Sequence, residues 1–66
     1  MKLTKRCDGN YMYSSDLVLI VVYVDRFRVE IFTRMEHFEH TDDSFEGAES
    51  FAKEFWNDLM RKELGL

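Results

Sequence analysis

The sequence predicts a small α+β protein: a three-stranded antiparallel sheet, built as a meander of β-hairpins, packed on one C-terminal α-helix. Two apolar segments separated by only two residues, 17–24 and 27–33, indicate a hairpin. Apolar residues then recur with helical spacing between positions 45 and 64. Because the 66 residues contain no proline and no linker-like stretch, we expect a single domain over 1–66.

The central hairpin is predicted from its β-branched composition and its short connection. The run LVLIVVYV at 17–24 is too short for a typical helix, and Asp25-Arg26 joins it to FRVEIFT by a tight turn or by a longer loop of the same parity. Either connection pairs Val24 with Phe27, Val22 with Val29 and Ile20 with Ile31. We expect this apolar face, Val18, Ile20, Val22, Val24, Phe27, Val29 and Ile31, to pack against Ala48, Ala52, Phe55 and Leu59 of the helix.

Turn and cap residues set the remaining boundaries. Cys7-Asp8-Gly9-Asn10 is the best turn signal and would join a strand near positions 2–6 with 11–13, because Asp-Gly tolerates positive φ angles. The acid-rich stretch 41–44 precedes the helix, and Asp43 and Glu46 have capping-box spacing. Gly65 is placed to end the helix.

The second face of the sheet is the main functional indication. A helix about 10 Å wide can cover only one face of the sheet, so the other face is left in water unless a partner covers it. Apolar, aromatic and arginine side chains of the kind found in interfaces fall on this side. We therefore predict the partner-binding residues Leu17, Leu19, Val21, Tyr23, Arg28, Phe32 and Arg34, and we expect a homodimer or a protein partner.

Charge is divided between the two halves of the chain. Residues 1–35 hold six basic and four acidic side chains, whereas residues 36–66 hold nine acidic and three basic ones. Such an acidic half could meet a basic target, although a solvated helix face is the more usual meaning of this pattern. The predicted acidic surface consists of Glu36, Glu39, Asp42, Asp43, Glu46 and Glu49.

Candidate chemistry is sparse. Cys7 has no histidine near it in sequence, and the three glycines form no phosphate-binding loop. His37 and His40 stand three apart among carboxylates, but they precede the helix cap, and on a strand they would point to opposite faces. We interpret their segment as a polar connector and predict no metal, no cofactor and no enzymatic activity.

These observations favour a non-enzymatic protein-binding module, a small inhibitor or regulator that blocks a macromolecular partner through its sheet face, its acidic helix or both. Small acidic proteins of this kind are common among phage and mobile-element inhibitors, an analogy of size and composition only. The alternative is nucleic-acid binding through Arg26, Arg28 and Arg34, interleaved with aromatic residues. A net charge of −4 weakens phosphate attraction. The longest apolar run has eight residues and the chain has one cysteine, so we expect a cytoplasmic protein without a membrane span or signal peptide.

Overall fold

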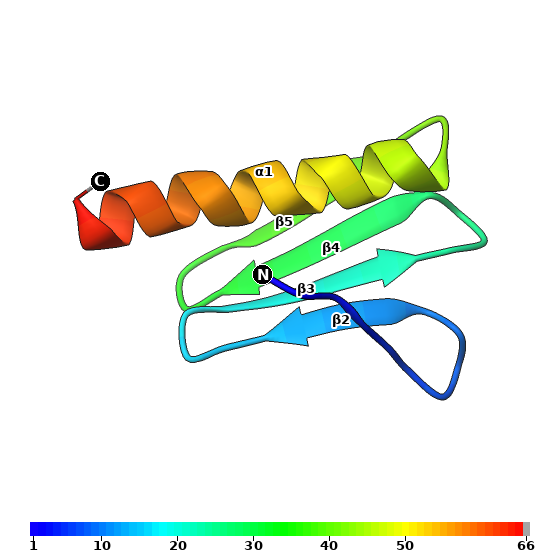
Figure 1. The fold of residues 1–66 in the computed structure, drawn as a ribbon, viewed down its shortest axis with the longest axis horizontal. Helices are drawn as coiled ribbons and strands as arrows, with labels where there is room; N and C mark the ends of the chain where they lie inside the picture. Colours follow the sequence, from blue (N-terminus) through cyan, green and yellow to red (C-terminus); the bar gives the residue numbers. More distant parts are fainter. Residues whose placement is uncertain (66) are drawn as a thin grey trace.

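The computed structural model, which describes residues 1–65, shows a five-stranded antiparallel sheet with one helix across one face (Figure 1). The elements are β1 (Thr4–Lys5), β2 (Tyr11–Ser14), β3 (Val18–Tyr23), β4 (Arg28–Thr33), β5 (His37–Thr41) and α1 (Phe45–Leu64). The strand order β1-β2-β3-β4-β5 is a simple meander. The α+β class and the C-terminal helix are confirmed, whereas the predicted number of three strands is wrong.

The largest departure from the prediction is β5, which occupies the segment interpreted as a polar connector. It pairs antiparallel with β4 through all five of its residues, from Phe32 opposite His37 to Arg28 opposite Thr41. Side chains alternate along a strand, so Phe38 and His40 turn toward the helix side of β5 and the residues that alternate with them turn toward water. With only one apolar residue, the segment lacks the alternation of apolar and polar residues by which a strand is predicted.

The central hairpin has the predicted register and a wider loop. Val22 lies opposite Val29 and Ile20 opposite Ile31, but the ladder ends at Tyr23 and Arg28. Asp-Arg is poor chemistry for the positive φ angles of a two-residue hairpin turn, and the structure uses the four residues 24–27 instead, with Phe27 at φ 51°. Val24 and Phe27 are consequently 38% and 37% exposed, so their predicted place in the core is wrong.

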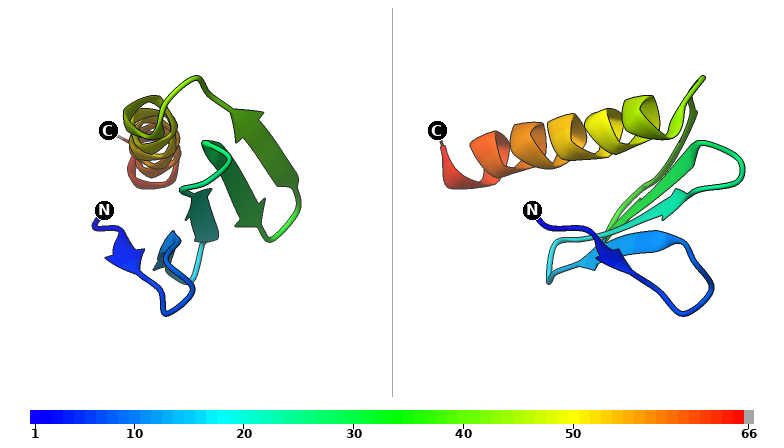
Figure 2. Two further views of the ribbon diagram at one scale, coloured as in Figure 1. Left: turned by 90° about the vertical axis from the view of Figure 1, so that its right-hand side faces the viewer. Right: turned by 45° about the vertical axis from the view of Figure 1, so that its right-hand side comes forward.

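The core lies between the β3–β4 hairpin and the middle of α1. Its buried members are Val18, Ile20, Val22, Val29, Ile31, Ala48 and Ala52. The N-terminal segment lies on the same side of the sheet as the helix (Figure 2), where Met1 and Leu3 pack against this core. Among residues 1–65, no helix has the length and apolar character needed to cross a membrane.

The helix begins one residue later than the capping-box spacing predicts. Ser44 is the N-cap, and its hydroxyl accepts a hydrogen bond of 3.1 Å from the Gly47 amide. Asp43 therefore does not cap the helix, and the predicted pairing of Asp43 with Glu46 is wrong. Gly65 ends the helix as predicted, in the left-handed conformation at φ 71°.

A histidine and an aspartate connect β5 to the start of the helix. His40 stacks on Phe51 with ring centroids 3.9 Å apart, and its Nε2 lies 3.1 Å from Asp42 Oδ2. Asp42 Oδ1 also accepts a hydrogen bond of 2.7 Å from the Asp43 amide. These hydrogen bonds, the one with His40 first, lower the pKa of Asp42 below its ordinary value of 3.8.

We predict that Asp42 contributes to stability at neutral pH and loses this contribution in acid. Because its folded pKa lies below the unfolded value, the contribution is complete above about pH 4 and disappears as pH falls through the folded pKa. Asp42→Asn should therefore flatten the acid limb of the stability curve in denaturant titrations. Asp43→Asn, which keeps the amide donor to Asp42, serves as the control; an equal change in both variants would contradict the assignment.

The tight approach of the helix to the sheet gives a second prediction. Ala52 is 0% exposed against the sheet, so Ala52→Leu should overpack this contact and lower the free energy of unfolding by about 1–3 kcal/mol. Lys53→Leu makes the same residue one position later on the exposed side of the helix and should change stability by less than about 1 kcal/mol. Thermal and urea unfolding measure both effects.

Candidate interface on the outer sheet face

The outer face, defined here as the sheet face opposite α1, carries one row of side chains through four strands. Met12, Val21, Glu30 and Glu39 lie opposite one another in this row, from β2 to β5. The neighbouring row contains Leu19, Phe32 and His37. The predicted outward positions of Leu19, Val21, Tyr23, Arg28 and Phe32 agree with this register, since alternate strand residues share a face.

The apolar part of the outer face is less exposed than the sequence indicates. Val21 is only 4% exposed, because Met12 and Glu30 are its cross-strand neighbours and further outer-face side chains flank it along β3. Leu19 and Tyr23 are half-buried, and Phe32 is 37% exposed. Val21 thus supports the sheet and offers little surface, which differs from its predicted role, whereas Phe32 is accessible.

Four charged or titratable residues form a cross-strand cluster beside Phe32. Glu30 and Glu39 stand directly opposite each other, an arrangement that costs free energy unless a cation neutralises it. The Arg28 guanidinium contacts Glu39 and lies 3.7 Å from Glu30. His37 Nε2 lies 3.2 Å from Glu30 and 3.8 Å from Glu39, and the His37 ring stacks on Phe32 at 4.4 Å.

Tyr23 is tied to the same cluster. Burial first, and then its hydrogen bond and charge interaction with Glu30, raise the pKa of Tyr23 above its ordinary value of 10.0. The phenol therefore stays protonated at neutral pH and can donate to the carboxylate. This hydroxyl extends the polar cluster across β3 and β4.

Glu30, His37 and Glu39 are also the residues that could hold a metal ion. Their nearest ligand atoms all lie within 4.8 Å of one another. A divalent cation would have to compete with Arg28, which already contacts Glu39, so the arrangement suits an ion-pair network better. His37 and His40 occupy opposite faces of β5 and do not join in one site.

Two predicted interface residues lie at the end of the sheet. Leu17 and Arg34 line an open groove of about 800 Å³ between the β4–β5 turn, residues 34–36, and the C-terminal half of α1. Met35 and Phe38 also line it, and Met35 is 90% exposed. Sequence reasoning missed Met35 and Phe38, although isolated large apolar residues in a polar segment were a signal for them.

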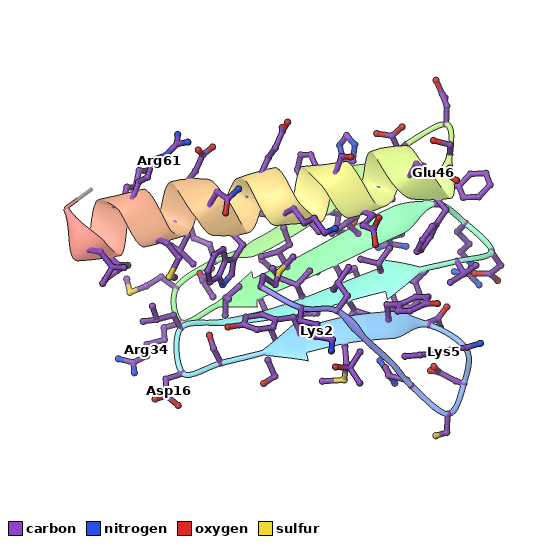
Figure 3. The ribbon with its side chains drawn as sticks, viewed as in Figure 1. Lys2, Lys5, Asp16, Arg34, Glu46 and Arg61 are labelled. Atoms are coloured by element: carbon purple, nitrogen blue, oxygen red, sulfur yellow. The ribbon has the colours of Figure 1, made fainter. Side chains whose placement is uncertain are left out.

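The arginines of the nucleic-acid alternative do not form a continuous stripe. Arg26 lies in the β3–β4 loop with Asp25 at 4.0 Å, and Arg28 is neutralised by glutamates. Arg34 projects at the turn end of the sheet, at the other end of the molecule from Glu46 (Figure 3). Of the three arginines, only Arg28 belongs to β4, and Arg26 and Arg34 lie in the loops beyond its two ends.

The predicted acidic surface is likewise divided among several places. Glu39 belongs to the outer-face cluster and Asp42 is paired with His40. Glu36 lies in the β4–β5 turn, and Glu49 is 3.9 Å from Lys53 on the helix. Asp43 and Glu46 are exposed at the helix start, where carboxylates favour the helix dipole. These residues form no single acidic face.

The chain matches no family model, no curated protein and no solved structure. The fold and the chemistry of its surface are therefore the grounds for proposing a function. The outer face is the candidate interface, because the helix leaves it uncovered and it combines an accessible aromatic ring with a charged cluster.

We predict that Arg28 stabilises the sheet by separating two opposed carboxylates. Arg28→Gln should lower the free energy of unfolding by about 0.5–1 kcal/mol, and adding Glu39→Gln should recover most of this loss because the repulsion disappears. Arg26→Gln, the same substitution in the exposed β3–β4 loop, should have little effect. Urea unfolding of five proteins (wild type, Arg28→Gln, Glu39→Gln, the double variant and Arg26→Gln) measures the coupling between Arg28 and Glu39; additive effects of the two single substitutions would refute it.

Proposed function

We propose that this chain is a non-enzymatic protein-binding module, a small inhibitor or regulator that blocks a macromolecular partner through its outer sheet face. The observation that carries the proposal is Phe32, which is 37% exposed on β4, on the sheet face that the helix does not cover. Leu19 lies beside it on β3, and Arg28 lies four positions before it on β4, on the same face. Aromatic and arginine side chains are the usual anchors of protein interfaces.

The rigidity of these side chains supports the proposal. Phe32 is held against His37, and Arg28 is held by Glu39, so a partner would order few additional rotamers on binding. The anchors also come from strands inside the sheet and not from its loops. An interface of this kind loses less conformational entropy when the complex forms.

The placement of reactive groups supports a non-enzymatic role. Cys7 is exposed in the β1–β2 turn, and within residues 1–65 both histidines hydrogen-bond carboxylates. Among the described residues the hydrogen-bond partners of the two imidazoles are these carboxylates, and no thiol or hydroxyl lies within hydrogen-bond distance of either ring as a nucleophile would. A free, exposed thiol suits the reducing cytoplasm, the compartment we propose for this protein.

The test compares the loss of partner affinity when outer-face residues are truncated with the loss when an equally exposed phenylalanine elsewhere is truncated. A partner is first isolated with the tagged wild-type protein from lysate of the native host. Phe32→Ala should then weaken binding by roughly 2 kcal/mol, about 30-fold, as should Leu19→Ala or Tyr23→Ala. Phe27→Ala is the control, because Phe27 is also 37% exposed but lies in the β3–β4 loop.

Two results would refute the proposal. One is an equal loss of affinity for Phe27→Ala and Phe32→Ala, since the outer face would then have no special role. The other is recovery of nucleic acid that survives moderate salt without an enriched protein. In that case alanine at Arg26, Arg28 or Arg34 should reduce the salt slope by about one unit each.

A further inference from the structure

We propose that a second copy of this chain pairs antiparallel with the free edge of β5, so that one continuous sheet runs through both copies. This dimer is distinct from the proposed outer-face interface, because it uses the backbone of β5 and the inner-face ring of Phe38. It also differs from the predicted association through the exposed sheet face.

The hydrogen bonds at the two ends of the β4–β5 ladder show which backbone groups are free. Thr33 N–H donates to the Glu36 carbonyl at 2.9 Å, and Asp42 N–H donates to the Phe27 carbonyl at 2.8 Å. Hydrogen-bonded and non-hydrogen-bonded pairs alternate between these ends. The N–H and C=O groups of His37, Glu39 and Thr41 therefore point away from β4, and all three residues are exposed.

The two edges of the sheet are protected to different degrees. The β1 edge has only two paired residues, and one of them is Lys5. Short edge strands and lysines are common means of preventing edge-to-edge pairing. The β5 edge has five residues, pairs with β4 without a bulge, and contains neither lysine nor proline. It is therefore the edge at which another strand can add.

Charge selects the register of the antiparallel pair. A two-fold axis at Glu39 would place Glu39 opposite Glu39 of the second copy, which is destabilising. An axis at His40 would place Glu39 opposite Thr41 of the second copy, which offers the carboxylate no charge partner. An axis at Phe38 places His37 of each copy opposite Glu39 of the other, an arrangement in which the imidazole can donate to the carboxylate.

The same register joins the apolar sides of the two copies. Phe38 is 36% exposed and lies 5.3 Å from Phe55 between ring centroids. An axis at Phe38 makes it a non-hydrogen-bonded pair with itself, in which facing side chains approach most closely. Phe55 covers only part of the Phe38 ring, so the exposed part is free to meet Phe38 of the second copy. A second copy therefore supplies a polar partner for His37 and Glu39 on the outer face and an aromatic partner for Phe38 on the inner face.

A proline substitution tests the edge. Glu39→Pro removes an outward N–H without removing a backbone hydrogen bond to β4. Compared with Glu39→Ala, which loses the same carboxylate, it should raise the dimer dissociation constant at least about tenfold in sedimentation equilibrium. Lys5→Pro is the matched control: Lys5 lies opposite Tyr11 between hydrogen-bonded pairs, so its N–H also faces outward, at the other edge. Circular dichroism and the thermal midpoint verify that both variants fold.

Cysteine trapping tests the register in a Cys7→Ser background. Phe38→Cys should form the disulfide-linked dimer faster than Glu39→Cys on mild oxidation, as measured by non-reducing electrophoresis. Faster linkage through Glu39→Cys would overturn the register. A wild-type monomer at millimolar concentration, or an equal effect of Glu39→Pro and Lys5→Pro, would overturn the dimer. Leu19→Ala should leave the dimer constant unchanged, which separates this result from failure of the proposed outer-face function.

Discussion

The structure depends on the close contact between the inner face of β3 and β4 and two alanines of α1. Ala48 and Ala52 are fully buried and have the smallest side chains that keep helical propensity, so the helix axis can approach the sheet. A helix about 10 Å wide covers only about two strands. The flanking strands are reached by rings: Tyr13 of β2 meets Trp56, and Phe38 of β5 meets Phe55. This geometry explains why so short a chain contains so many aromatic residues.

The parts of the fold that the sequence predicts are those whose burial is periodic. The ladder of Ile20 with Ile31 follows from alternation and a short connection, and the helix follows from its apolar stripe. The segment of β5 lacks this signal, because its inner side is covered partly by the stacking of His40 on Phe51. The prediction that Phe27 lies in the core fails for a local reason: its place in the turn, at positive φ, overrides its hydrophobicity.

The outer face shows the same division between what local pattern determines and what neighbouring strands determine. Strand parity places Phe32 and Arg28 correctly, since it requires only the central hairpin. The burial of Val21 depends on Met12 of β2, and the neutralisation of Arg28 depends on Glu39 of β5. Both effects come from strands whose pairing the sequence does not specify. A basic stripe in the sequence thereby becomes an ion-pair cluster in the fold.

The polar composition of β5 follows from its two sets of contacts. On the outer face, Glu39 is bound to β4 through Arg28; on the inner side, His40 is joined to the helix through Phe51 and Asp42. These contacts order the strand by side chains that tolerate water, so the strand needs no covering layer on its outer face. Its backbone groups at the free edge remain unused by β4. An edge that is ordered in advance pairs at a lower entropic cost than a disordered segment does, which is the physical argument in favour of the proposed pairing with a second copy.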